Sequence, residues 1–180
     1  MKNPESKFPH LVKEDWNAGI RDPLLFLAQG LGSGCIAPMR GSWGTLGGVA
    51  FYLLIAEYIT NYSYWMVFVV LATIVGIPLC TYAENKLASK DPHCVVWDEW
   101  CGIWFAYSLL PLMPVSSMPN YAWLIIGFVI FRWLDITKPG LIGRMENLSK
   151  GAGIMLDDIV AGIATAAILY MLGLVAAVII

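Results

Sequence analysis

Residues 150–162 read Lys150-Gly-Ala-Gly-Ile-Met-Leu-Asp157-Asp158-Ile-Val-Ala-Gly162, and the rest of the chain is organised around this stretch. A glycine-rich turn leads into two adjacent carboxylates, and these open an apolar run that reaches Ile180. Two adjacent carboxylates at the beginning of a membrane helix are unfavourable unless a positive charge lies close to them. We therefore expect a divalent cation here, with carboxylates from other segments around it.

The composition indicates a membrane protein of one domain, residues 1–180. The chain is 58% hydrophobic and only 13% charged, and its mean hydropathy is +0.67, well above that of an ordinary soluble domain. A net charge of -2 gives no reason to expect nucleic acid as a partner. The four cysteines are scattered without a CxxC pair, so neither a zinc site nor a disulfide framework is expected.

The first part of the chain differs from the rest. Residues 1–22 form a polar N-terminal segment without the apolar core of a signal peptide. Residues 24–31 are apolar but shorter than the roughly 20 residues that span a bilayer, so they predict a short helix at the interface or packed on the bundle. Residues 30–48 hold seven glycines and Pro38, and no regular helix is expected there.

Apolar segments in the remainder predict an all-α polytopic membrane bundle with about five spans. They cover roughly residues 46–60, 64–82, 100–113, 121–136 and 159–180. If all five cross, the 61–63 turn, the 114–120 loop and the C-terminus share one side. All eleven Lys and Arg residues then fall on the other side, which the positive-inside rule makes cytoplasmic.

The first candidate site is Val95-Val96-Trp97-Asp98-Glu99-Trp100. Adjacent carboxylates on a helix point about 100° apart, so one side chain can bind a metal while the other binds a second group. An alternative interpretation is a helix N-terminus at which acidic residues favour the positive end of the helix dipole.

The second candidate site is Phe131-Arg132-Trp-Leu-Asp135-Ile-Thr-Lys138-Pro139. Arg132 and Asp135 are three residues apart and share a helix face, and Pro139 ends the helix. The alternative is an intrahelical Arg–Asp pair that neutralises itself.

Two further stretches complete the set. Asp157 and Asp158 suit a metal, with simple capping of the last helix as the alternative. In the glycine-rich stretch, free backbone amides and the hydroxyls of Ser42 and Thr45 can bind phosphate oxygens, and a plain tight connection is equally compatible. No Gly-Lys-Ser/Thr follows, so the stretch is not a P-loop.

Together these motifs predict one site at the cytoplasmic rim. Carboxylates without a His or Cys cluster indicate magnesium rather than zinc as the cofactor. The predicted ligands are Asp98, Glu99, Asp135, Asp157 and Asp158. Arg132 and Lys138 stand near the same rim and would neutralise phosphate charge, which phosphoryl chemistry requires.

Common covalent mechanisms have no support in the sequence. There is no Cys-x5-Arg motif and no Asp-x-Asp nucleophile pair. His10 and His93 are the only histidines, and His93 in Asp91-Pro-His-Cys94 is more typical of a surface loop than of a catalytic base.

Four motifs in order resemble the phosphatidylglycerophosphatase A family of bacterial inner-membrane lipid phosphatases, from about residue 24 to the end. They are Gly41-Ser-Trp-Gly44-Thr45-Leu-Gly, Val96-Trp97-Asp98-Glu99-Trp-Cys-Gly102-Ile-Trp104, Phe131-Arg132-Trp-Leu-Asp135-Ile-Thr-Lys138-Pro139, and Gly151-Ala-Gly-Ile-Met-Leu-Asp157-Asp158-Ile-Val-Ala-Gly162.

The resemblance implies magnesium-dependent hydrolysis of phosphatidylglycerophosphate to phosphatidylglycerol and phosphate, in phospholipid biosynthesis. The implied partners are a phospholipid substrate and the bilayer, with the oligomeric state open. The five acids would bind metal, and we expect Asp98, Glu99 and Asp158 to be catalytic. Phosphate would bind to Arg132, Lys138, Thr45 and Ser42.

Two other classes of protein compete with this interpretation. A CDP-alcohol phosphotransferase also uses membrane aspartates and magnesium, but its Asp-Gly-x2-Ala-Arg pattern is missing here. A carboxylate-lined cation carrier would place its acidic residues near the middle of the membrane, whereas these lie at predicted helix ends.

Overall fold

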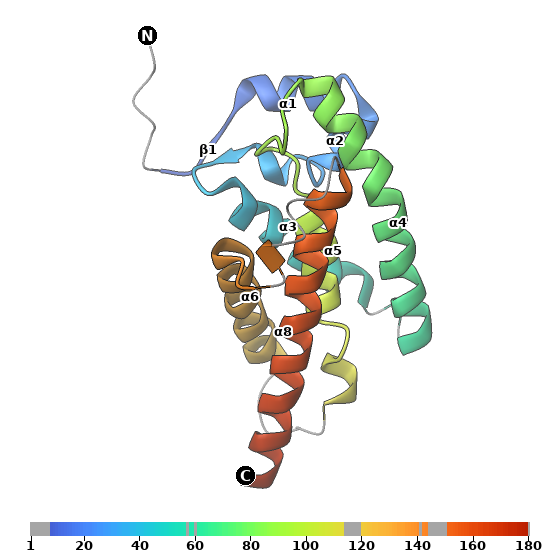
Figure 1. Ribbon diagram of the computed structural model, residues 1–180, viewed down its shortest axis with the longest axis vertical. Helices are drawn as coiled ribbons and strands as arrows, with labels where there is room; N and C mark the ends of the chain where they lie inside the picture. Colours follow the sequence, from blue (N-terminus) through green and yellow to red (C-terminus); the bar gives the residue numbers. More distant parts are fainter. Residues whose placement is uncertain are drawn as a thin grey trace.

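A short buried helix forms the centre of the molecule. The computed structural model describes residues 8–56, 58–59, 61–113, 120–140, 142–143 and 151–179, and the fold below is that of these residues. The main helices surround α5 (Trp97–Ala106), as Figure 1 shows. They are α3 (Arg40–Ala56), α4 (Tyr62–Leu87), α6 (Asn120–Thr137) and α8 (Gly151–Ile179).

Helix α5 is buried because its side chains, apart from Asp98 and Glu99 in the first turn, are apolar or aromatic. All of its residues except Glu99 and Phe105 are buried. Trp100 and Trp104 pack with ring centroids 5.7 Å apart, and Phe51 of α3 packs on both. The indole nitrogen of Trp104 donates a hydrogen bond of 2.9 Å to the carbonyl oxygen of Gly48. A helix that is apolar all round is stable only inside such a bundle.

The structure supports two of the five predicted spans. Among the described residues, only α4 and α8, with 26 and 29 residues, are long and apolar enough to cross a membrane. The predicted span over 100–113 is not supported, because α5 ends at Ala106 and a turn and a 3-10 helix (Leu110–Leu112) follow. An apolar run reads the same whether protein or lipid covers it, so composition alone did not distinguish them. The 114–120 loop lies almost entirely outside the described residues.

The expectation of no regular helix in residues 30–48 is wrong for its second half. Helix α3 begins at Arg40, although four glycines lie in its first nine residues. A methyl group added at Gly44 would lie 2.5 Å from Cβ of Val96, so this residue must be small where α3 meets the start of α5. Tertiary packing thus overrides the low helix propensity of glycine.

Helix α8 begins earlier than predicted. The Gly151-Ala-Gly153 stretch is its first turn rather than a loop, so Asp157 and Asp158 are its seventh and eighth residues. This position is past the first turn, which excludes capping as the reason for the two acids. Asp98 and Glu99, in contrast, do lie in the first turn of α5.

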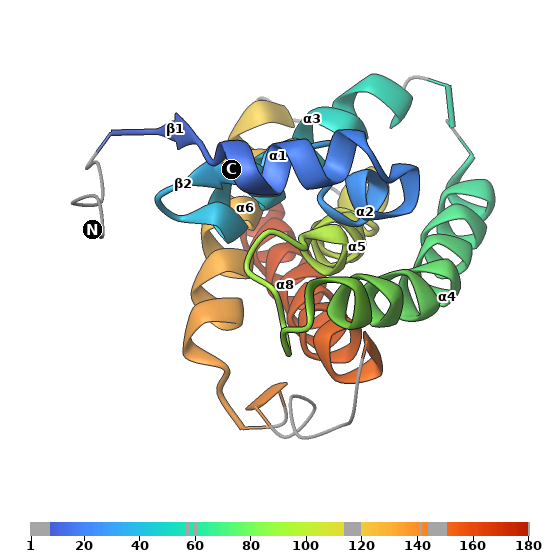
Figure 2. The same cartoon turned by 90° about the horizontal axis from the view of Figure 1, so that it is seen from above.

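A small N-terminal layer covers one end of the bundle, seen from above in Figure 2. It contains α1 (Lys13–Ile20), α2 (Pro23–Ala28), a 3-10 helix (Ser33–Cys35), and strands β1 (His10–Leu11) and β2 (Ile36–Ala37), which pair antiparallel. The fold is therefore helical with one minimal sheet rather than strictly all-α. The predicted interfacial helix is α2, and it packs on the bundle with Leu25 and Ala28 buried.

Candidate active site

The candidate site forms where α5 and α8 touch. A methyl group added at Gly162 of α8 would overlap the carbonyl oxygen of Gly102 of α5. Asp98 and Asp158 each precede their glycine by four residues, about one helical turn. The two helices run in the same direction in Figure 1. The contact between the glycines therefore brings both carboxylates to the same level of the bundle.

Three of the five predicted acids converge on one point. Asp98, Glu99 and Asp158 each offer a carboxylate oxygen, and these oxygens all lie within 4.8 Å of one another. Asp98 and Asp158 are only 7% and 3% exposed. Within the described residues, Asp98 Oδ1 and Glu99 Oε2 are buried and have no hydrogen-bond partner. Buried oxygens that repel one another and lack donors fit a bound cation, and an all-oxygen donor set suits magnesium.

The acids on α5, which is not one of the two candidate spans, are held in an environment that disfavours their charge. Burial, reinforced by Glu99, raises the pKa of Asp98 well above its usual value. Burial also raises the pKa of Glu99 to about 8, and the charges of Asp158 and Asp135 act in the same direction. Arg132 opposes this shift but does not cancel it. A divalent cation would restore the charged form of both groups.

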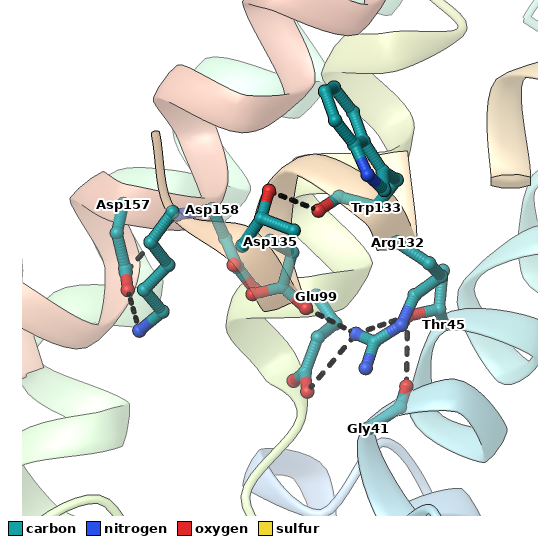
Figure 3. A network of polar contacts seen from close by, with 10 residues as sticks. Gly41, Thr45, Glu99, Arg132, Trp133, Asp135, Asp157 and Asp158 are labelled. Atoms are coloured by element: carbon teal, nitrogen blue, oxygen red, sulfur yellow. Dashed lines mark hydrogen bonds and ion pairs between the residues drawn. The ribbon is translucent and has the colours of Figure 1, made fainter. Parts of the chain in front are cut away.

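Arg132 connects the acids to α3, as Figure 3 shows. Its guanidinium contacts Asp135 at 2.5 Å and lies 3.9 Å from Glu99 Oε1. It also donates a hydrogen bond of 3.3 Å to the hydroxyl of Thr45, which in turn donates to the carbonyl oxygen of Gly41. Arg132 therefore does more than neutralise Asp135 within α6, because its contacts join α6 to α3 and α5.

The remaining two acids each have a cationic partner. Asp157 accepts a bond of 2.7 Å from Lys138, and Asp135 accepts one from Arg132. Their contribution to metal binding stays a prediction. In Figure 3, Asp135 lies beside Asp158, and Asp157 lies to the left of both.

Of the two predicted phosphate-binding hydroxyls, the structure places only Thr45 in contact with the site. Its side chain is fully buried and bonded to Arg132. Ser42 is half-buried, and neither hydroxyl residue is among those that line the pocket described next. The backbone of this stretch reaches the acids at Gly41, where an added methyl group would lie 2.6 Å from Glu99 Oε1.

The acids open into a pocket of about 660 Å³. All five predicted acids line it, together with Arg132 and Lys138. It also includes Arg40, His10 and His93, which the sequence interpretation left out of the site. His10 reaches the pocket only because β1 pairs with β2, a contact between residues far apart in sequence. Arg40 directly precedes the Gly41–Gly47 motif, and this position was the only sequence feature that could have indicated a role for Arg40 in the site.

Comparison with known proteins identifies the family of the chain. The family model described as phosphatidylglycerophosphatase A matches residues 26–173. The chain is 35% identical to phosphatidylglycerophosphatase A of Escherichia coli, over 86% of both chains. It is 31% identical to the protein of the same name from Haemophilus influenzae, over 80% of this chain and 85% of the relative.

A third relative carries a different name. The putative phosphatidylinositol-3-phosphatase of Bacteroides thetaiotaomicron is 41% identical over 53% of this chain and 57% of its own length. No solved structure matches the chain. The family model covers the four motifs and the helices that carry the pocket acids, from the second half of α2 to most of α8. The chain belongs to the phosphatidylglycerophosphatase A family.

Proposed function

We propose that this protein is a lipid phosphatase that hydrolyses the terminal phosphomonoester of phosphatidylglycerophosphate, with magnesium as cofactor. The observation that carries the proposal is the convergence of Asp98, Glu99 and Asp158, within 4.8 Å, in a pocket that also holds Arg132 and Lys138. Family membership and the names of the two long relatives support the choice of substrate.

The acid trio would hold the cation. Bound magnesium supplies positive charge against the phosphoryl oxygens. The protein supplies the fixed geometry: α5 and α8 cannot separate at Gly102 and Gly162 without losing their packing, so the three carboxylates are preorganised. Such preorganisation lowers the reorganisation needed when charge develops in the transition state.

The neighbouring residues have separable tasks. Arg132, oriented by Asp135 and Thr45, would donate to the phosphate oxygens, and Lys138 would add positive charge from the other side. We infer that Asp98 or Glu99 takes the proton of the attacking water.

The phosphate of a lipid must reach the pocket while its acyl chains stay in the bilayer. Helices α4 and α8 meet the requirements for crossing a membrane. The outer faces of α3 and α6 are also apolar, with exposed residues such as Leu53, Leu54, Ile125 and Val129. We therefore propose a multi-pass protein of the bacterial inner membrane, with the pocket towards the cytoplasm as the distribution of Lys and Arg indicates.

The carrier alternative is disfavoured by the position of the acids. Asp158 is the eighth of 29 residues in α8, so the trio lies in the first third of that helix rather than at its middle. A carrier site would lie near the midplane of the bilayer.

The test is phosphate release from phosphatidylglycerophosphate by the purified protein in detergent. We expect activity that requires magnesium and disappears with EDTA. Asp158→Asn removes a trio member and should abolish release, whereas Asp157→Asn, its neighbour outside the trio, should retain measurable turnover. Glu14→Gln on exposed α1 serves as a control for the loss of an acid. Metal-independent release, or equal losses in the two aspartate variants, would contradict the assignment.

A further inference from the structure

The pocket, at about 660 Å³, is larger than a single phosphate with its cation requires. The acid trio forms one end, on α5 and α8. Another wall of the same cavity is lined by Arg40 at the start of α3, His10 of β1 and His93 of the loop between α4 and α5. A substrate bound only by its terminal phosphate would make no contact with the residues of this wall.

Arg40 is built into that wall. It is the first residue of α3, and its guanidinium lies 2.7 Å from the Asp15 carboxylate of α1. Both side chains are about three-quarters covered, with 26% and 22% exposed. The next residue, Gly41, lies against the carboxylate of Glu99. Arg40 is therefore adjacent in sequence to a residue that contacts the acid trio.

The arginine retains donors for a ligand. A guanidinium carries five N–H groups in a fixed fork. Among the described residues, the only ion-pair or hydrogen-bond partner of the Arg40 side chain is Asp15. Arg132 differs, because Asp135, Glu99 and Thr45 already surround it. Of the two described arginines that line the pocket, Arg40 therefore has fewer partners, and the carboxylate that holds it leaves the rest of its fork available to the cavity.

We propose that Arg40, positioned by Asp15, binds the phosphodiester of the substrate while its terminal phosphate occupies the acid end. This inference rests on the proposed function and adds a specificity determinant to it. The pocket then selects glycerolipids that carry a diester phosphate in addition to the monoester. A simple phosphatidate has only the monoester, so it makes no contact with Arg40.

Steady-state kinetics of the full chain in mixed micelles test the assignment, with phosphatidylglycerophosphate and phosphatidate as alternative substrates. Arg40→Gln should raise KM for phosphatidylglycerophosphate about tenfold, as expected for loss of a charge-assisted hydrogen bond. Because the reacting phosphate is untouched, kcat should change less than about twofold, and turnover of phosphatidate should not change. Arg21→Gln, an exposed arginine outside the pocket, is the matched control.

A second measurement remains decisive if phosphatidate is not a substrate. Phosphatidylglycerol keeps the diester and lacks the terminal phosphate, so it should inhibit the wild type competitively, and about tenfold more weakly in Arg40→Gln. Asp15→Asn should shift KM in the same direction, and Arg40→Lys should restore part of the affinity, which also shows that the position tolerates change.

The outcomes separate the two proposals. No phosphate release by the wild type from phosphatidylglycerophosphate would refute the proposed function. With an active wild type, unchanged KM and unchanged product inhibition in Arg40→Gln would refute the diester subsite alone. An equal fall in kcat on both substrates would assign Arg40 to the reacting phosphate, and would also overturn the subsite.

Discussion

Glu99 combines burial, a neighbouring arginine and two further acids. Its pKa of about 8 lies far above the 4.5 of an ordinary glutamate, and burial raises the pKa of Asp98 in the same direction. In the metal-free protein these groups bind more protons when folded than when unfolded. Stability should therefore fall as pH rises from about 4.5 to about 8.

Thermal denaturation of the metal-free protein across this pH range checks the sign. Magnesium should remove this loss of stability, because a bound cation stabilises the ionised carboxylates. Glu99→Gln should make the stability of the metal-free protein depend less on pH. A metal-free midpoint that rises over the same range would show that the acids are not buried together.

Arg132 should not be replaceable by lysine. Its guanidinium reaches Asp135, Glu99 and the Thr45 hydroxyl at once, and a single ammonium cannot keep all three contacts. We expect Arg132→Lys to lower kcat by about tenfold or more, since a charge-assisted contact to the reacting phosphate is weakened. The measurement is magnesium-dependent phosphate release, with Arg21→Lys as the control. Wild-type kcat in the variant would place the arginine outside the reaction.

The contact between α5 and α8 sets the geometry of the trio. Gly162→Leu would drive a side chain into the backbone of α5 at Gly102, and overpacking of this kind typically costs about 1–3 kcal/mol. We expect a lower melting temperature and a loss of activity larger than the loss of folded protein, because Asp98 and Asp158 move apart. Ala167→Leu, on the exposed face of α8, should change neither. Full activity in the glycine variant would show that the contact does not position the acids.

Packing between the glycines of α3 and the tryptophans of α5 explains why α3 is helical although its glycines disfavour a helix. The small residues of α3 let Val96, Trp100 and Ile103 approach its backbone, and Trp104 adds a hydrogen bond. Local propensity predicted a loop here because each glycine weakens an isolated helix by about 1 kcal/mol. The packing partner that reverses this preference lies about 50 residues away, so no local window contains it.

The two ends of the molecule differ in chemistry, and this difference makes its membrane orientation testable. The N-terminal layer and the pocket occupy one end in Figure 1, and the C-terminus of α8 lies at the other. If the bundle crosses with the cationic end inside, a reporter fused after Ile180 should report the periplasm and one fused before Met1 the cytoplasm.

Fusions with alkaline phosphatase and green fluorescent protein measure this directly in bacterial cells. Alkaline phosphatase is active only outside the cytoplasm, so we expect activity at the C-terminus alone. Fluorescence from both the N-terminal and the C-terminal fusion would place both termini in the cytoplasm and would contradict the predicted orientation.

The motifs alone allowed the membrane class, the family resemblance and the acidic character of the site to be predicted. These properties follow from composition and from residue types at short spacing, which any window of the chain displays. The long helices α4 and α8 were also predictable, because an uninterrupted apolar run of such length has few other structures available.

Tertiary structure alone decided which acids meet. The sequence predicted all five carboxylates as metal ligands at one rim, and in the structure Asp98, Glu99 and Asp158 share one point while Asp135 and Asp157 contact Arg132 and Lys138. It also decided that α5 lies inside protein rather than lipid, and that Arg40 and His10 line the same pocket as the acids. The reason is physical: side-chain direction and helix approach depend on packing between residues distant in sequence, and only the folded chain brings these together.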